Sequence, residues 1–482
     1  MPKMLPEVFV SHAGLTSKVS KELKKGKLRK LGSRVYTSNL AEKAEVLIKR
    51  HTWHIVGELF PKSVIVDRTA LEHRPASDGS VFIVSKKKRT VTLPGLRIYP
   101  RKGHGPLKED KPFMGKLYLS CPARAFLENL CPRRLRKGKI SRTLSRQEIE
   151  ERLEMLLQRA GMDALQNLRD DARAICSKLK LKKEFKILDA LIGALLGTRK
   201  VRMSSAVGRA RARGLPYDPK RLDLFQKFYE ILAGNPTPER TNPKARSALP
   251  FFEAYFSNFI EGTEFTVEEA ADIIFEGKIP KNRPEDAHDI LGTYQLVSDT
   301  REMKKCPRTE EEFIALLKKR HALIMQGRPE MHPGQFKTEP NRAGATLFVA
   351  PDLVEGTLRK GFQWMQGLNT PFQKAIYIMF LVAEVHPFAD GNGRCARIMM
   401  NAELIAEEQS RIIIPIIFRD DYLTALRALT HQGRAKPLIR ALDFAQKYTS
   451  LIDWSDFKKA HKMLIKTHAF EDELKGHRLV LP

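Results

Sequence analysis

Short apolar runs, each bounded by Gly, Pro or charged clusters, fill residues 63–127. SVIVD, SVFIVS, TVTLP and GLRIYP are rich in β-branched residues, and their length and composition are typical of strands. From Ser145 the spacing of apolar residues becomes helical, and Ser145 with Glu148 has the spacing of a capping box ahead of IEERLEMLLQ. The pattern predicts a small mixed α/β domain at 46–140 and a helical region at 141–233.

The first 45 residues combine a short polar helix with a basic hairpin. SKVSKELKKG ends at Gly26, and an alternating segment with a turn at Gly32-Ser33 follows it. A helix followed by a basic hairpin is how a winged helix-turn-helix ends, so we predict this DNA-binding fold for residues 1–45. The alternative is a solvated basic helix. The candidate DNA contacts are Ser17, Lys18, Lys21, Lys25 and Arg34.

The second half of the chain has helical spacing almost throughout. GNPTPERTNPKA, residues 234–245, has no periodicity and several prolines, so we predict the main interdomain linker there. Thr370 and Pro371 form an N-cap and first turn for an apolar helix, and a second helix should begin within the Gly-rich turn that follows. GQFKTEPNRAGATLFVAP, residues 334–351, is predicted to form a β-hairpin among these helices.

The expected fold class is mainly α, with a helical core at 246–450 and a helical tail at 451–482. A chain of 482 residues is long enough for two to four domains. The N-terminus lacks the apolar run of a signal peptide, and the apolar stretch 375–383 is too short to span a bilayer. The five cysteines are scattered without a C-x-x-C pair, which argues against disulfides and structural zinc. We therefore expect a cytoplasmic protein that does not associate with a membrane.

Positive charge is concentrated in the N-terminal part of the chain. Residues 1–200 carry 44 Lys and Arg against 20 Asp and Glu, a net of +24 of the total +29. Residues 201–482 carry the remaining 41 against 36, a net of +5. Basic surfaces attract phosphate backbones through counterion release, so the distribution predicts DNA as a partner of residues 1–200.

HPFADGNGRCAR, residues 386–397, places a histidine and an acid at a Gly-Asn-Gly turn between two predicted helices. Free N–H groups at a helix start bind anions, and glycines let the backbone approach phosphate closely. Arg394 and Arg397 are three residues apart, so both guanidinium groups can hold one polyphosphate. Asp390 offers a hard oxygen for Mg²⁺, and His386 can take a proton at neutral pH. These residue types together indicate transfer of a nucleotide group to a hydroxyl.

This stretch resembles the Fic-family signature His-Pro-Phe-x-Asp-Gly-Asn-Gly-Arg-x-x-Arg at every specified position. The resemblance implies an ATP-dependent protein adenylyltransferase that modifies a Ser, Thr or Tyr of a target protein. It implies that His386 is the general base and that Asp390 binds Mg²⁺. The hairpin at 334–351 resembles the family's flap, which holds the target chain by strand pairing. The phosphate-binding residues implied by the signature are Gly391, Asn392, Gly393, Arg394 and Arg397.

A second resemblance concerns the end of the helix FFEAYFSNFIEG. Ser257, Glu261 and Gly262 resemble the inhibitory motif Ser/Thr-x-x-x-Glu-Gly/Asn of Fic proteins that carry it N-terminal to the core. The resemblance, which covers about residues 245–450, implies that Glu261 pairs with Arg397 and removes the γ-phosphate site. The alternative is an ordinary helix end.

Two other functions stay open beside the adenylyltransferase. Residues 1–200 resemble, more loosely, abortive-infection antitoxin-like regulators, so the chain could be a DNA-binding regulator whose core is a sensor. Alternatively, Glu261 could position a water that removes AMP from a modified protein. The sequence does not identify the target protein or the DNA site. The oligomeric state is also open, and a homodimer is one possibility. Asn401 and Tyr422 are candidates for the pocket that binds the nucleobase.

Overall fold

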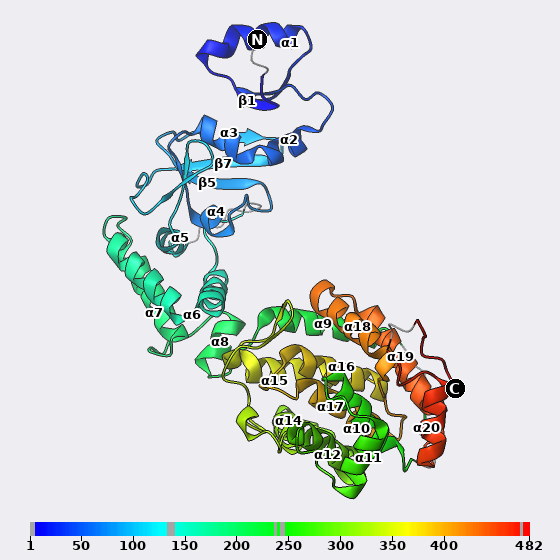
Figure 1. Ribbon diagram of the computed structural model, residues 1–482. Helices are drawn as coiled ribbons and strands as arrows, with labels where there is room; N and C mark the ends of the chain where they lie inside the picture. Colours follow the sequence, from blue (N-terminus) through cyan, green and yellow to red (C-terminus); the bar gives the residue numbers. More distant parts are fainter. Residues whose placement is uncertain (1–4, 133–139, 236–238, 242–245, 473–475) are drawn as a thin grey trace. The chain divides into compact units, whose positions relative to one another are not determined.

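The computed structural model describes residues 5–132, 140–235, 239–241, 246–472 and 476–482. The chain divides into two compact units, Met1–Arg213 and Gly214–Pro482 (Figure 1). The division lies before the predicted linker at 234–245, because the helix α9 (Pro219–Ala233) packs against helices of the second unit. Of that predicted linker, 236–238 and 242–245 lie outside the described residues.

The chain begins with a small antiparallel sheet in the order β1-β3-β2, made of β1 (Val8–Val10), β2 (Arg29–Gly32) and β3 (Val35–Thr37). The helix α1 (Thr16–Lys24) buries Val19 against Phe9 and Leu28. The helix and the hairpin therefore lie where the pattern predicts them. A 3₁₀ turn, η1 (Ala13–Leu15), comes directly before α1, where a helix-turn-helix has an α-helix. The winged helix-turn-helix therefore stays a prediction.

A six-stranded mixed sheet in the order β6-β7-β5-β4-β9-β8 forms the centre of the first unit (Figure 1). Its strands are β4 (Val64–Ile65), β5 (Ser80–Val84), β6 (Val91–Leu93), β7 (Leu96–Arg101), β8 (Lys111–Phe113) and β9 (Leu117–Leu119). The four apolar runs of the sequence are β4 to β7, so their prediction as strands is confirmed. The helices that accompany the two sheets are α2 (Ala44–Arg50), α3 (Thr52–Leu59), α4 (Asp67–Glu72) and α5 (Pro122–Asn129).

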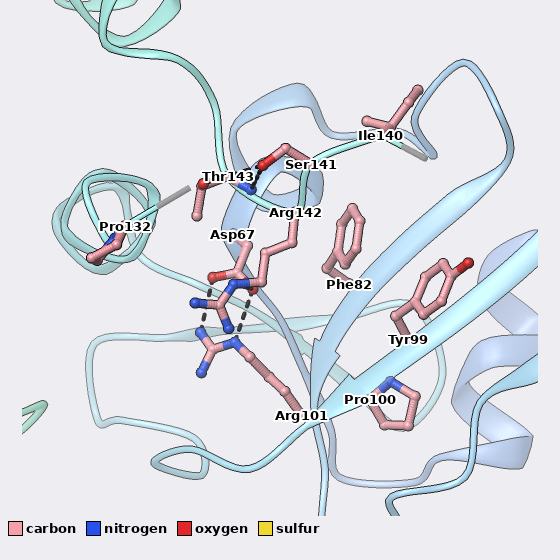
Figure 2. Close-up of a pocket in the computed structure, with 10 residues that line it drawn as sticks. All are labelled: Asp67, Phe82, Tyr99, Pro100, Arg101, Pro132, Ile140, Ser141, Arg142 and Thr143. Carbon is pink, nitrogen blue, oxygen red and sulfur yellow. Dashed lines mark hydrogen bonds and ion pairs between the residues drawn. The ribbon is translucent and has the colours of Figure 1, made fainter. Parts of the chain in front are cut away.

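A cavity of about 540 Å³ lies against this sheet (Figure 2). Asp67, which is completely buried, accepts two hydrogen bonds from the Arg101 guanidinium at 2.8 and 3.0 Å, and Arg142 lies 3.8 Å away. On the other side, the rings of Phe82 and Tyr99 stack on neighbouring strands with centroids 5.6 Å apart. A buried carboxylate requires such partners, since an unpaired charge in the interior costs several kcal/mol. The ion pair of Asp67 with Arg101 thus ties α4 to β7.

Helices complete the first unit. The helix α6 (Arg146–Cys176) begins at the predicted capping box, in which the Ser145 hydroxyl accepts from Glu148 N and Glu148 accepts from Ser145 N. It bends at Gly161, whose φ of 77° lies in the left-handed region. The helices α7 (Lys182–Leu195) and α8 (Ala206–Ala212) follow. The helical region predicted from residue 145 onward is therefore confirmed.

The second unit is helical around one apolar core (Figure 1). At its centre lie α16 (Pro371–Val385) and α17 (Asn392–Ala406), which pack against each other over most of their length. A two-stranded hairpin, β10 (Arg342–Ala343) and β11 (Thr346–Leu347), confirms the predicted hairpin at 334–351. The other helices are α9 to α15 and α18 to α20: α10 (Leu249–Ile260), α11 (Val267–Glu276), α12 (Pro284–Ser298), α13 (Thr300–Met303), α14 (Glu310–Ile324), α15 (Val354–Met365), α18 (Arg419–Gln432), α19 (Ala435–Leu451) and α20 (Phe457–Lys466). Short 3₁₀ turns are η2 (Pro329–Met331), η3 (Pro351–Leu353) and η4 (Ile416–Phe418).

Two expectations drawn from composition can be compared with this fold. All five cysteines are free thiols. Among the described residues, no helix combines the length and apolar character needed to cross a membrane. The fold as a whole is mainly α with small sheets near the N-terminus, as predicted.

Candidate active site

The candidate site is the loop that joins α16 to α17. Thr370 caps the start of α16 through a capping box with Gln373, and the helix ends at His386, whose φ and ψ of 53° and 61° are left-handed. Gly391, with a φ of 72°, is the N-cap of α17. Two left-handed residues thus reverse the chain within one short loop, and the second is a glycine because this conformation costs an L-residue roughly 1–2 kcal/mol.

Side chains brace the loop from inside. The Asn392 amide accepts from Phe388 N at 2.8 Å and donates to Phe388 O at 2.9 Å, and the Phe388 ring is fully buried. A Cβ added to Gly391 would lie 2.7 Å from Met325 Sδ, so a larger residue does not fit there. The backbone at the start of α17 is therefore held in one position.

His321 of α14 fixes the other side of this loop. Its Nδ1 accepts from Gly334 N at 2.9 Å, so its proton is on Nε2, which donates to Asp390 O at 3.0 Å. Its ring lies flat on Phe388, with centroids 3.6 Å apart and planes at 6°. Burial lowers the pKa of His321 to about 4, so the ring is neutral at physiological pH.

His386 is arranged as a base. Its Nδ1 lies 3.3 Å from Ala383 O, and a carbonyl only accepts, so Nδ1 carries the proton and Nε2 keeps a lone pair. The ring stacks on Phe348, with centroids 3.8 Å apart and planes at 4°. Phe348 belongs to the hairpin segment, which is residues 334–351 and contains β10 and β11. Burial, with a smaller effect of the Lys337 ammonium, lowers the pKa of His386 to about 4, although the hydrogen bond to Ala383 O acts in the opposite direction. The imidazole is thus neutral and able to accept a proton through Nε2.

Arg394 is a buried cation with a buried partner. Its Nη1 lies 2.8 Å from Asp289 Oδ2 of α12, and its Nη2 lies 3.6 Å from Asp390 Oδ2. Arg328 also binds Asp289 Oδ2, at 2.9 Å. The Asp390 side chain itself is 45% exposed, and its Oδ1 accepts from Gly391 N at 2.7 Å. A carboxylate that is partly exposed, in a loop that can bind phosphate, is a suitable ligand for a hard cation such as Mg²⁺.

Arg397 is bound by the end of α10. Its Nε donates to the Ser257 hydroxyl at 3.0 Å, and its Nη2 donates to Ser257 O at 2.8 Å and to Glu261 Oε1 at 2.7 Å. Arg397 is nearly buried, whereas the Glu261 side chain is 32% exposed. Ser257, Glu261 and Arg397 therefore lie together, and Gly262 follows with a φ of 93° that lets the chain turn away from the helix.

The Glu261 carboxylate also covers the start of α17. A Cβ added to Gly393 would lie 2.1 Å from Glu261 Oε1 and 3.1 Å from Arg397 Nη1. Any side chain at position 393 would therefore displace the carboxylate. Glu261 thus places a negative charge at the N-terminal turn of α17, where the helix dipole and free N–H groups favour an anion.

The two base-pocket candidates are both buried. Asn401 donates to Glu253 Oε1 at 2.8 Å and accepts from Ile412 N at 2.8 Å, so its amide already joins α10, α17 and the segment that follows α17. The Tyr422 hydroxyl lies 3.4 Å from Met379 Sδ. Their role in base recognition stays a prediction.

The candidate DNA contacts lie in the first unit. Ser17, Lys18, Lys21 and Lys25 are at least partly exposed along α1 and its C-terminal end, and the buried Val19 faces the sheet instead. Arg34 lies in the turn between β2 and β3 with a φ of 65°, and its Nε donates to Ser11 O at 2.9 Å. The four residues of α1 and its end thus form a largely basic surface, whereas Arg34 also has a structural hydrogen bond.

Sequence reasoning missed the residues that hold the loop from other parts of the chain. His321, Asp289 and Lys337 are distant from the signature in sequence, and only Lys337 lies in a segment that the sequence singled out, the predicted hairpin at 334–351. A lone histidine in KKRHALI gives no sign that its ring faces a loop 65 or more residues later. Only the packing of α12, α14 and the segment 334–351 in the second unit reveals these partners.

The low pKa of His321 has a consequence for stability. The unfolded chain takes up a proton near pH 6.5, whereas the folded ring does so only near pH 4. The contribution of His321 to the free energy of unfolding is therefore fully present above pH 6.5. It is lost as the pH falls toward 4, and the loss is roughly 3 kcal/mol. We expect His321→Gln to show a smaller loss of unfolding free energy between pH 7 and 4.5 than the wild type, as measured by urea denaturation. Equal losses in the two proteins would contradict a buried neutral His321.

Comparison with known proteins concerns the second unit. Residues 313–404 match the model of the Fic/DOC family, which confirms the family resemblance of residues 386–397. Over 262 residues, the chain is 24% identical to the protein adenylyltransferase Fic of Drosophila persimilis and 23% identical to that of Drosophila melanogaster. These alignments cover 52% of this chain and 51% and 52% of the relatives, so the chain spans about half the length of the curated relatives it matches.

The solved structures to which the chain has similarity include two Fic proteins. Fic-1 (residues 134–508) of C. elegans has a TM-score of 0.37 at 16% identity, covering 64% of this chain and 98% of that one. A Fic domain containing signaling protein from Bacteroides thetaiotaomicron has a TM-score of 0.36 at 19% identity, covering 47% of this chain and 92% of that one.

Proposed function

We propose that the second unit is a protein adenylyltransferase that transfers AMP from ATP to a Ser, Thr or Tyr hydroxyl of a target protein. The observation that carries this proposal is the neutral His386, with a lone pair on Nε2, at a loop that leads into a helix start flanked by Arg394 and Arg397. The match to the Fic/DOC family and the curated adenylyltransferase relatives support it.

The residues have complementary roles in this reaction. The target hydroxyl oxygen forms a bond to the α-phosphorus of ATP, and the bond from that phosphorus to the bridging oxygen breaks, which releases pyrophosphate. The hydroxyl proton moves to His386 Nε2. The backbone of Asn392 and Gly393 offers N–H groups to the phosphates, Gly391 lets the backbone approach them closely, and the two arginines supply positive charge.

Asp390 is the residue that would hold Mg²⁺. Its carboxylate is partly exposed, and the Arg394 guanidinium lies 3.6 Å from its Oδ2. Mg²⁺ typically binds one or two carboxylates together with substrate phosphates, and this donor fits that pattern. When bound, the metal ion supplies charge neutralisation at the phosphate oxygens.

We further propose that Glu261 restrains this activity. Its carboxylate occupies the fork of Arg397 and lies over Gly393, and a γ-phosphate would need the same guanidinium. While the pair persists, ATP lacks an anchor that would align the α-phosphorus with the attacking hydroxyl. A second candidate activity uses the same carboxylate, because its partial exposure lets Glu261 position a water that hydrolyses an AMP–protein bond.

The experiment that tests the proposed function is mass spectrometry after incubation with Mg²⁺ and each of several nucleoside triphosphates. AMP added to the chain or to proteins of a lysate, with ATP preferred, supports the adenylyltransferase. Release of AMP from a pre-modified target, without addition, supports the hydrolase. If neither reaction is observed in the wild type or in Glu261→Gly, both proposed activities are overturned and a regulator is favoured.

We also propose that residues 1–200 bind duplex DNA, on the basis of the net charge of +24 and the exposed basic face of α1. Lys18→Gln with Lys21→Gln should reduce the slope of log affinity against log salt by roughly 0.9 for each phosphate that the protein no longer neutralises. The measurement is fluorescence anisotropy of labelled duplex DNA with the full chain. Lys278→Gln with Lys459→Gln is the matched control, since both lysines are exposed on the second unit. Equal slopes for the two double variants would contradict α1 as the element that binds DNA.

A further inference from the structure

The base of the hairpin segment is bonded to three successive carbonyls of the candidate catalytic loop. Lys337 Nζ donates to His386 O at 2.8 Å, Lys337 N donates to Pro387 O at 2.9 Å, and Asn341 Nδ2 donates to Phe388 O at 2.9 Å. Lys337 Nζ also donates to Asn341 Oδ1 at 2.6 Å, so the two side chains support each other. The loop backbone from His386 to Phe388 therefore has fixed partners on the hairpin segment.

The position of His386 explains why such partners are needed. A non-glycine residue with a φ of 53° is strained by roughly 1–2 kcal/mol, and it keeps this conformation only where the surroundings hold it. The carbonyls at the end of α16 also lack intrahelical donors and carry the negative end of the helix dipole. A cation that donates a hydrogen bond to His386 O holds this strained residue in place, and it also interacts favourably with the negative end of the helix dipole.

Lys337 is an unusual residue to find in this place. It is only 5% exposed, and within the part of the chain that the structure describes it forms no ion pair. Burial and, to a smaller extent, the positive charge of Arg221 lower the pKa of Lys337 to about 7. An amine that is buried without a carboxylate costs free energy that a methionine or leucine would not, so its presence indicates a role beyond packing.

The outer end of the hairpin is anchored separately. Arg221 of α9 donates to Leu347 O at 2.8 Å and pairs with Glu384 of α16, and Thr346 lies 2.9 Å from the His431 ring. These contacts place Phe348, whose ring covers the His386 imidazole. The hairpin thus orients the ring of His386 through Phe348, and it orients the backbone of His386 through Lys337.

We propose that Lys337 is a positioning residue that, with Asn341, clamps the hairpin onto the loop and holds His386 in its left-handed conformation, with Nε2 available to the target hydroxyl. This inference rests on the proposed adenylyltransferase function. Lys337 touches neither the nucleotide-binding arginines nor Asp390 in any contact of the described residues, so it acts on the base and leaves nucleotide binding to other groups.

The test compares Lys337→Met, which keeps the length of the side chain without its N–H donors, with Lys337→Arg, which restores a donor and charge. Both changes are made in the Glu261→Gly background so that turnover is measurable. Loss of a hydrogen bond from a charged group predicts a fall in kcat of roughly 10- to 100-fold in Lys337→Met, with KM for ATP unchanged and partial recovery in Lys337→Arg. The control is Lys318→Met. The Lys318 ammonium of the wild type lies 4.2 Å from the centroid of the Phe336 ring, beside the same hairpin.

A second measurement does not depend on activity. Hydrogen–deuterium exchange of peptides that cover residues 383–391 should be faster in Lys337→Met than in wild type or Lys318→Met. If circular dichroism shows Lys337→Met to be unfolded, Asn341→Ala takes its place in both measurements. Equal kcat and equal exchange in Lys337→Met and Lys318→Met would overturn the clamp. Absence of turnover in the Glu261→Gly parent would instead overturn the proposed function, and the exchange comparison would then decide the inference alone.

Discussion

His386→Ala should abolish nucleotide transfer while the nucleotide still binds. In the proposed reaction the imidazole takes the proton of the attacking hydroxyl in the transition state, and the ground-state phosphates are held by the arginines and the start of α17 instead. Loss of a general base costs about 10²–10⁴ in rate. The measurement is incorporation of labelled AMP at saturating ATP, together with ATP binding by isothermal titration calorimetry.

The variant needs a control because position 386 is left-handed. Alanine at a φ of 53° is strained, and it also loses the stack on Phe348. Asparagine tolerates this conformation better, so His386→Asn separates loss of the base from loss of the loop geometry. Both variants should bind ATP like the wild type and lack transfer. Transfer at the wild-type rate in a folded His386→Asn protein would show that another group is the base.

Glu261→Gly should raise AMP incorporation. Arg397 donates to Glu261 and to Ser257 at the same time, and its fork can bind one carboxylate or one γ-phosphate fully, but not both. A hydrogen bond between charged groups contributes about 1.5–3 kcal/mol, so its removal should increase incorporation by roughly 10- to 100-fold. Better alignment of the α-phosphorus can add to this, because orientation supplies up to about 7–11 kcal/mol in favourable reactions. Wild type and variant are compared for labelled-AMP incorporation at one ATP concentration.

Three further variants identify the cause of this gain. Glu261→Ala removes the carboxylate without the backbone freedom of glycine, which costs about 1 kcal/mol in a helix relative to alanine. Glu264→Ala removes an exposed carboxylate three residues away and should leave incorporation at the wild-type value. Glu261→Gly with Arg397→Ala should lose the gain, because the released partner is then missing. Equal incorporation by wild type and Glu261→Gly would leave Ser257, Glu261 and Gly262 as an ordinary helix end.

Much of the local structure could be predicted because short-range rules apply to it. The capping box at Ser145 and the N-cap at Thr370 each mark a helix start in the structure. The division of the chain was harder to predict, because α9 looks like part of the preceding helical region. Its apolar face packs in the second core through Phe225 and Phe228, a long-range contact that local periodicity does not encode.

The sequence by itself indicated the chemistry that we propose for the candidate site. The order of residues in HPFADGNGRCAR indicates a base, a metal ligand and a phosphate-binding helix start, because these roles depend on residue type and on spacing within one loop. Only the tertiary structure decided how that loop is held. His321, Asp289 and Lys337 come from three other segments, and each binds the loop or the helix that follows it. The pairing of Glu261 with Arg397, by contrast, is one that the family resemblance already implied. Contacts between residues distant in sequence depend on how the helices pack, and that packing follows from burial of the whole apolar core, which a local pattern does not specify.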